Sequence, residues 1–279
     1  MVWRGGGRTW TIGARPLVMG ILNVTPDSFS DGGLYADPEA AVARGLAMAA
    51  DGADLVDVGG ESTRPGAAPV APETEAQRVV PVIRRLAAAG VAVSVDTRHA
   101  GVAAEAVAAG ACVINDVTGF RDPAMAALAS RTGAGGVVMH MKGDPRSMQD
   151  LAVYDDVVEE VAAWLTDRLA VLTAAGVDAE TLVVDPGFGF AKTAAHNASL
   201  LAGLGRLAAL GRPILIGLSR KSWLGLLTGG RPPRERGAAS LAALCAAVWN
   251  GARIVRVHDV RESADAVRVL DALAGEANG

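Results

Sequence analysis

The chain has 279 residues, of which 51% are hydrophobic, and this is enough apolar material to bury one large core or two small ones. Its formal net charge of -4 argues against a broad nucleic-acid-binding surface or membrane-binding patch, although a local anion site remains open. No apolar run is long enough to cross a bilayer, and the N-terminal MVWRGGGRTW lacks the apolar core of a signal peptide, so we predict a cytoplasmic protein.

Along the chain, short apolar runs alternate with longer segments of helical period, which is typical of repeated β-α units. The predicted strands are 16–23, 54–60, 91–97, 112–117, 136–141, 182–187, 213–219 and 254–260. Helix-like segments cover 38–52, 73–90, 100–110, 154–176, 237–252 and 261–275. Strands that are apolar on both faces indicate a parallel sheet covered by helices.

Eight such units favour an α/β fold with a single closed (β/α)₈ TIM barrel. The alternative is an open Rossmann-like sheet, but no Gly-x-Gly-x-x-Gly follows the first strand. The residues before Pro16 resemble a short N-terminal hairpin that closes the bottom of the barrel. No linker divides the chain, so we expect one domain over residues 1–279.

Polar side chains stand at or just after the end of every predicted strand. In this fold the carboxyl ends of the strands form the rim that carries the chemistry. A single polar residue there is often only a helix cap, but polar ends on all eight strands indicate a site. The set is Asn23, Glu61 to Arg64, Asp96, Asn115 with Asp116, His140, Asp185, Ser219 to Lys221, and Arg256 with His258.

One part of this rim suits a planar heterocycle. Asp96, Asn115 and Asp185 offer two carboxylates and an amide, which can match an amino group, ring N–H groups and a carbonyl. Lys221 could donate to the same ring. A metal pair or a general acid and base is the alternative for the two aspartates, but the intervening amide is a poor metal ligand.

The other part of the rim suits an anion. Arginine forks match pairs of phosphate oxygens, and a histidine can donate a ring N–H to an oxyanion. Asp31, in the loop after the first strand, would then be available for a magnesium ion that bridges phosphate oxygens. The residues of this part are Asn23, Thr63, Arg64, Arg256 and His258.

Lysine occurs only at positions 142, 192 and 221, although the chain has 26 basic side chains. Lysine offers a compact, rotatable charge where arginine offers a planar fork, and we interpret Lys221 as a residue that uses this difference. Lys142 is interpreted as a surface residue. Lys192 either braces the loop after the sixth strand or is a solvated cation. His140 is predicted to pack at a strand end, and His99 and His196 to begin helices.

The polar strand ends belong to the segments MGILNVTPDSFSDGG, DVGGESTRPGA, SVDT, INDV, MHMKGDPRSMQ, DPGFGFAKTAAHN, GLSRKS and RVHDV. From about Val18 to Val260, these segments resemble the motifs of the dihydropteroate synthase family, in that family's order and spacing. The resemblance implies that dihydropterin pyrophosphate condenses with para-aminobenzoate and that pyrophosphate is released, in folate biosynthesis. It also implies Mg²⁺, a cytoplasmic homodimer and a sulfonamide target.

The resemblance assigns a role to each motif residue. The pterin contacts are Asp96, Asn115, Asp185 and Lys221, and the pyrophosphate contacts are Asn23, Thr63, Arg64, Arg256 and His258. The para-aminobenzoate contacts are Phe29, Pro65, Phe190, Lys221 and Ser222, the metal ligands are Asn23 and Asp31, and the catalytic residues are Asp96, Asp185, Lys221, Arg256 and His258.

Three other functions remain open at this point. A pterin-binding methyltransferase would share the barrel and the aspartate and asparagine contacts, but it would not need SRKS or the RVH pair. A divergent homologue without activity should show decay in TRPG or SRKS, and both are intact. A sulfonamide-insensitive synthase would keep every motif, because discrimination depends on loop shape.

Overall fold

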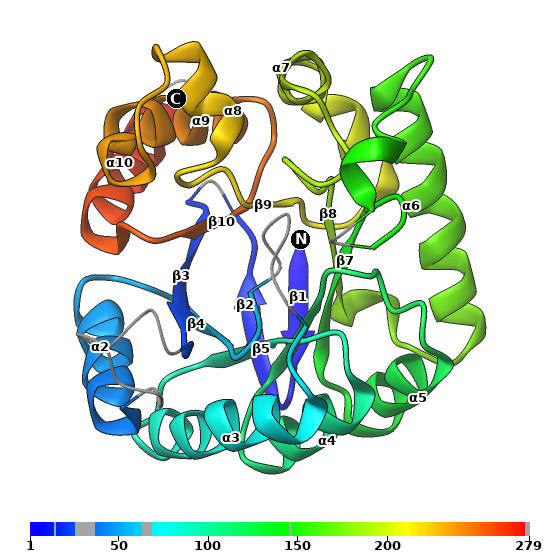
Figure 1. The fold of residues 1–279 in the computed structure, drawn as a ribbon, viewed down its shortest axis with the longest axis vertical. Coiled ribbons are helices and arrows are strands. Elements are labelled where there is room, and N and C mark those ends of the chain that lie inside the picture. Colours follow the sequence, from blue (N-terminus) through cyan, green and yellow to red (C-terminus); the bar gives the residue numbers. More distant parts are fainter. Residues whose placement is uncertain (14, 26–36, 63–68, 145–146, 277–279) are drawn as a thin grey trace.

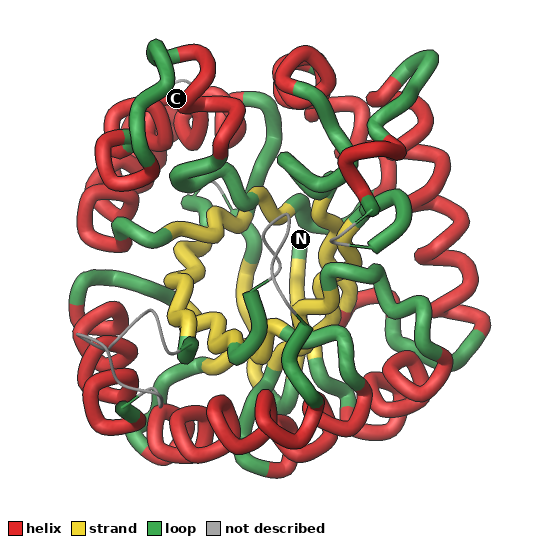
Figure 2. The backbone as a smooth tube through the Cα atoms, in the orientation of Figure 1, coloured by secondary structure: helices red, strands yellow, loops and turns green. Residues whose placement is uncertain are grey.

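The computed structural model describes residues 1–13, 15–25, 37–62, 69–144 and 147–276. Eight parallel strands form the central sheet, in the order β8-β7-β6-β5-β4-β3-β10-β9. A parallel bridge between Val184 and Ile214 joins the two ends of this order and closes the barrel. Figure 2 shows the result, a ring of strands enclosed by a ring of helices. The predicted (β/α)₈ barrel is confirmed.

The barrel strands are short and almost wholly buried, as strands covered on both faces must be. They are β3 (Leu17–Asn23), β4 (Leu55–Gly59), β5 (Val93–Asp96), β6 (Val113–Asp116), β7 (Gly135–Met139), β8 (Leu182–Asp185), β9 (Leu215–Ile216) and β10 (Ile254–Val257). The strand predicted over 213–219 is reduced to two residues, because the chain leaves the sheet at Gly217 to bring Ser219 beside His258.

The described helices surround the strands (Figure 1). They are α2 (Pro38–Ala50), α3 (Pro72–Ala88), α4 (Ala100–Ala108), α5 (Pro123–Thr132), α6 (Val157–Ala174), α7 (Ala194–Ala202), α8 (Ser222–Leu227), α9 (Gly237–Trp249) and α10 (Val260–Glu276). None of the helices in these described ranges is long and apolar enough to cross a bilayer.

Local sequence explains where several helices begin. Proline occupies the first turn of α2, α3 and α5, where its missing N–H and fixed φ favour a start. Asp37 and Asp122 accept hydrogen bonds from the first-turn N–H groups of α2 and α5. The helix predicted from 154 begins at Val157, because Asp156 caps the N–H groups of Val158 and Glu159.

The N-terminal residues form an antiparallel hairpin of β1 (Val2–Gly5) and β2 (Arg8–Thr11). It lies across one end of the barrel (Figure 1). Trp3 is fully buried there, and its Nε1 donates to the Thr181 carbonyl at 2.9 Å. The aromatic ring packs into a cluster formed by the amino-terminal parts of the barrel strands. The predicted hairpin is therefore confirmed, and it leaves the carboxyl end of the barrel for the site.

Candidate active site

The predicted heterocycle contacts lie at or next to the carboxyl ends of three barrel strands. Asp96 is the last residue of β5 and faces Asn115 of β6 in the strand register, and Asp185 is the last residue of β8. All three side chains are buried. Because the strands run parallel, their carboxyl ends place these groups on the same rim of the barrel.

Arg256 connects this group with the predicted anion region. From β10, its guanidinium donates to Asp57 Oδ2 at 2.6 Å and to Asp96 Oδ2 at 2.5 Å. Asn115 Nδ2 donates to the same Asp57 oxygen at 2.9 Å. The predicted heterocycle contacts and the predicted anion contacts are thus joined in one charge-assisted hydrogen-bond network at the barrel mouth.

Burial dominates the electrostatics of the two predicted pterin-binding carboxyls. It raises the pKa of Asp96 to about 7, although the charge of Arg256 acts in the opposite direction. Burial also raises the pKa of Asp185, against the hydrogen bond that the Gly187 N–H donates to Asp185 Oδ1 at 2.7 Å. Buried carboxyls with raised pKa values in a barrel mouth are typical of a functional site.

Lys221 stands at the entrance to α8, where it is the N-cap residue and Ser222 is the first helical residue. Its Nζ lies 4.3 Å from the centre of the Phe190 ring, a cation–π contact. Gly189, with φ +79°, passes the lysine so closely that an added Cβ would lie 3.3 Å from its Cδ. The lysine side chain is therefore held between a ring and a glycine.

The preceding residue, Arg220, fixes the backbone that presents Lys221. It adopts φ 59°, a left-handed conformation that is unfavourable for arginine. Its N–H donates to Ser240 Oγ at 2.9 Å, and its guanidinium pairs with Asp259, which lies between β10 and α10. These contacts stabilise the strained residue and thereby the position of the lysine.

His258 follows β10 and is positioned by Ser219. The Ser219 hydroxyl accepts the His258 backbone N–H at 3.2 Å and lies 3.0 Å from His258 Nδ1. A hydroxyl that accepts from the backbone can donate its own proton to Nδ1, which leaves the proton of a neutral ring on Nε2. The Nε2–H group can then donate to an anion.

Lys192 braces the loop that carries Phe190, and the alternative of a solvated cation is wrong. The side chain is 3% exposed, and its Nζ contacts His140 Nδ1 at 3.0 Å and the carbonyls of Gly187 and Phe190 at 3.1 Å each. Burial lowers the pKa of Lys192 to about 7. Burial, with the charges of Lys192 and Lys142, also lowers the pKa of His140 to about 2, so the imidazole is neutral.

The remaining histidine and lysine predictions also agree with the structure. His140 is buried directly after β7, His99 is the N-cap residue of α4, and His196 belongs to the capping box of α7. Lys142 is partly exposed and pairs with Glu160 at 3.0 Å. Its Nζ also lies 3.6 Å from the centre of the Tyr154 ring.

Not every predicted site residue can be placed. Asn23 is the last residue of β3 and is partly buried. The other predicted residues of the loops after β3 and β4 lie outside the described residues, namely Phe29, Asp31, Thr63, Arg64 and Pro65.

The sequence reasoning missed Asp57 and the positioning role of Ser219. Asp57 lies within β4 and not at its end, so a search of strand ends passes over it. The signal was available, because a carboxylate inside an apolar strand needs a buried partner. Arg256 and Asn115 are those partners.

A hairpin closes one end of the parallel barrel, and buried polar groups lie at the other end. Known proteins similar to this chain in sequence and fold form one family. The model of the family described as "Pterin binding enzyme" matches residues 19–258. The dihydropteroate synthase of Mycobacterium leprae is 51% identical over 262 residues, which are 91% of this chain and 92% of that protein.

Solved structures give the same result. The dihydropteroate synthase of Xanthomonas albilineans with 4-aminobenzoic acid has a TM-score of 0.91 at 49% identity and covers 98% of this chain and 99% of its own. The Yersinia pestis enzyme, in a sulfonamide drug complex, has a TM-score of 0.93 at 43% identity and covers 99% of this chain and 100% of its own. The fold is thus that of a pterin-binding barrel enzyme. Within that class, the chain belongs to the dihydropteroate synthase family.

Proposed function

We propose that the chain condenses 6-hydroxymethyl-7,8-dihydropterin pyrophosphate with para-aminobenzoate to give 7,8-dihydropteroate and pyrophosphate in folate biosynthesis. The main support for placing this reaction at the rim is a hydrogen-bond network. In it Arg256 donates to Asp96 and Asp57, and Asn115 donates to the same Asp57 oxygen. It places acceptors and donors for a pterin beside a fixed cationic group that suits pyrophosphate.

The pterin ring would lie against Asp96, Asn115 and Asp185. The carboxylates accept from the amino and ring N–H groups, and Lys221 donates to the ring carbonyl or a ring nitrogen. Because these side chains are buried, each polar contact is made away from competing water and contributes more than it would at the surface.

The pyrophosphate would lie beside Arg256 and the Nε2–H of His258, with Asn23, Thr63 and Arg64 as further donors. We propose Asn23 and Asp31 as the magnesium ligands, since their side chains supply the oxygen atoms that this ion prefers. The bound ion would supply positive charge to the departing pyrophosphate. Asn23 is the last residue of β3, at the carboxyl end of the barrel, and this position supports the proposal.

Para-aminobenzoate would occupy the space beside Phe190, Lys221 and Ser222, completed by Phe29 and Pro65. The Phe190 ring already contacts Lys221, so the same residues can hold the pterin on one side and the aromatic amine on the other.

In the proposed reaction the C–O bond to pyrophosphate breaks first, and pyrophosphate leaves with the bonding electron pair. Ionised Asp96 and Asp185 stabilise the pterin methyl cation, and Arg256 and His258 stabilise the leaving group. The amine lone pair of para-aminobenzoate then forms the C–N bond, and the amine loses a proton. No side-chain nucleophile takes part.

The direct test is to incubate the chain with the pterin pyrophosphate, para-aminobenzoate and Mg²⁺ and to follow both products. We expect pyrophosphate and 7,8-dihydropteroate in equal amounts, and no 7,8-dihydropteroate when para-aminobenzoate is omitted. Pyrophosphate release without dihydropteroate in the complete mixture would contradict the proposed condensation.

We also propose that the active form is a homodimer. An apolar groove between α7, α8 and α9 is lined by Leu201, Trp223, Leu227, Ala239 and Ala246, among others. The apolar side chains of Leu226, Leu227 and Trp249 are largely exposed on the same helices. A large exposed apolar surface on neighbouring elements is typical of an interface. A cytoplasmic location stays a prediction from the sequence.

A further inference from the structure

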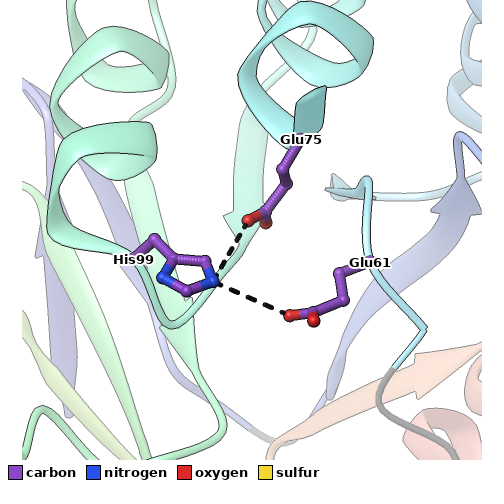
Figure 3. A group of neighbouring side chains, drawn as sticks. All are labelled: Glu61, Glu75 and His99. Carbon is purple, nitrogen blue, oxygen red and sulfur yellow. Dashed lines mark ion pairs between the residues drawn. The ribbon is translucent and has the colours of Figure 1, made fainter. Parts of the chain in front are cut away.

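Three ionisable side chains from three different elements converge beside the barrel mouth (Figure 3). Glu61 lies in the connection after β4, Glu75 lies in the first turn of α3, and His99 is the N-cap residue of α4. His99 Nε2 lies 4.0 Å from Glu61 Oε2 and 3.9 Å from Glu75 Oε2. One ligand atom from each residue lies within 4.8 Å of the other two.

The buried carboxylate of Glu75 is the unusual member of this cluster. Its side chain is 0% exposed, and neither oxygen accepts a hydrogen bond within the part of the chain that the structure describes. Burial raises the pKa of Glu75 to about 7, although the nearby Thr97 hydroxyl favours the charged form. A buried carboxylate without a strong partner is unfavourable unless another group supplies positive charge.

The neighbouring arginines are already engaged. Arg98 donates to both oxygens of Glu61, from Nε and Nη2, at 3.0 Å each. Arg78 donates to the Gly60 carbonyl at 2.8 Å. The closest cationic candidate for Glu75 is therefore His99, and its buried Nε2 also has no hydrogen bond to a described residue.

The donor set is that of a divalent transition-metal site. Imidazole nitrogen and carboxylate oxygen are common zinc ligands at about 2.0–2.2 Å, which separates neighbouring ligand atoms by about 3.3 Å. The His99 Nε2 separations of 3.9 and 4.0 Å, and a separation of up to 4.8 Å between the glutamate ligand atoms, require the atoms to move inwards by up to about 0.8 Å to reach this spacing. Mg²⁺ prefers oxygen ligands alone, so the imidazole favours zinc or a related ion.

We propose that Glu61, Glu75 and His99 bind one divalent transition-metal ion of the zinc type. The ion would neutralise the buried Glu75 and tie the connection after β4 to the starts of α3 and α4. The His99 side chain is 26% exposed, which gives the ion a route to the ligands from solvent. The site is separate from the magnesium ligands proposed for pyrophosphate, and it does not depend on the proposed function.

The test uses the full chain, stripped with a chelator and titrated with ZnCl₂ by calorimetry without Mg²⁺ or pyrophosphate. We expect one zinc ion per chain at this site. Since even outer-shell partners change metal affinity by 10–100-fold, His99→Gln and Glu75→Gln should each weaken zinc binding by about 100-fold or more.

Two matched variants control for other surface ligands. His196→Gln removes a histidine from a helix start where glutamine can also complete the capping box. Glu73→Gln removes an exposed carboxylate from the same first turn of α3. Both controls should keep the affinity of the unaltered chain.

A second readout is Co²⁺ added in place of zinc, which should give visible absorption bands that His99→Gln removes. The proposal is overturned if the unaltered chain takes up no zinc at micromolar concentration. It is also overturned if His99→Gln, which changes a partly exposed side chain and should fold, binds zinc as tightly as His196→Gln does.

Discussion

At the scale of single residues, the most specific feature of the site is the space around Lys221. The ammonium lies 4.3 Å from the Phe190 ring, and Gly189 passes so close to the lysine stem that an added Cβ would lie 3.3 Å from Lys221 Cδ. Arginine keeps the charge but has a larger, planar head. We predict that Lys221→Arg loses most of the condensation rate, in kcat as well as in KM, because the geometry of attack is disturbed.

Lys142→Arg is the matched control, because Lys142 is partly exposed and its pairing with Glu160 is one that arginine can also make. In steady-state kinetics we expect the kcat and KM of this control to stay close to those of the unaltered chain. If Lys221→Arg is equally close to it, the special role of the lysine is wrong.

Asp185 gives a second prediction at this scale. Asp185→Asn keeps an oxygen that can accept the Gly187 N–H, so the turn after β8 should fold. It removes the negative charge and one acceptor from the predicted pterin contact, and an unpaired polar contact in a closed site costs about 1–3 kcal/mol. Calorimetry with a pterin ligand should show affinity reduced by about 5–150-fold. Unchanged affinity would remove Asp185 from the site.

At the scale of elements, Lys192 links the end of β7 to the loop before α7. Its three Nζ contacts are made in a buried space. A guanidinium cannot occupy the same buried space with the same contacts, so we predict a loss of stability. Chemical denaturation should show a lower free energy of unfolding for Lys192→Arg than for Lys142→Arg.

The lowered pKa of Lys192 also predicts how its contribution changes with pH. In the folded chain the ammonium loses its proton at about pH 7, whereas in the unfolded chain it does so near its usual value of 10.5. Between these values the unfolded state binds more protons, so the contribution to stability rises with pH. It is at its lowest below pH 7.

Lys192→Met removes this titrating group, and because the Lys192 charge also acts on the pKa values of His140 and Asp185, the comparison is confined to the range above pH 7. The free energy of unfolding of the unaltered chain minus that of the variant should increase from pH 7 to pH 9. A difference that is constant or that falls with pH would contradict the lowered pKa.

The sequence predicts the barrel well because each strand is a buried apolar run and each helix repeats its apolar positions. It also predicts the polar strand ends, since in this fold the carboxyl ends share one rim. It does not predict the bridge from Arg256 to Asp57 and Asp96, because those contacts form only when barrel closure brings β10 opposite β4 and β5. The sequence also does not predict that Glu61, Glu75 and His99 lie together, since they are separated along the chain.

The hairpin offers a further test at this scale. Trp3 is completely buried beneath the barrel and donates to the Thr181 carbonyl. Trp3→Ala would leave a cavity and an unpaired carbonyl, and we predict a loss of about 3–5 kcal/mol of stability. Denaturation should show this loss, whereas Trp10→Ala, at the partly buried neighbouring ring, should cost less. Equal losses would show that burial of Trp3 is not what fixes the hairpin.

At the scale of the whole molecule, the two ends of the barrel have separate tasks. The hairpin end is apolar and stabilises the fold, whereas the rim collects buried charge that is unfavourable for stability. Such a division lets loops change at the rim without disturbing the packed end. It also leaves the outer helices free to form contacts between copies of the chain.

The homodimer is the prediction that belongs to this scale. Leu227 and Trp249 are 68% and 67% exposed on α8 and α9, beside the apolar groove, and water contact with both is unfavourable. We expect sedimentation velocity at micromolar concentration to show a dimer. The double variant Leu227→Asp/Trp249→Asp should sediment as a monomer, because an interface cannot bury two new unpaired charges.

The matched control is Val153→Asp, since Val153 is 74% exposed but follows the short helix at Met148–Leu151, outside the groove. It carries the same new charge and should remain dimeric. Circular dichroism should show all variants folded, since each altered side chain is already in water. A double variant that stays dimeric would place the interface elsewhere. An unaltered chain that sediments as a monomer would exclude the homodimer. In that case the exposed leucine and tryptophan would need another partner.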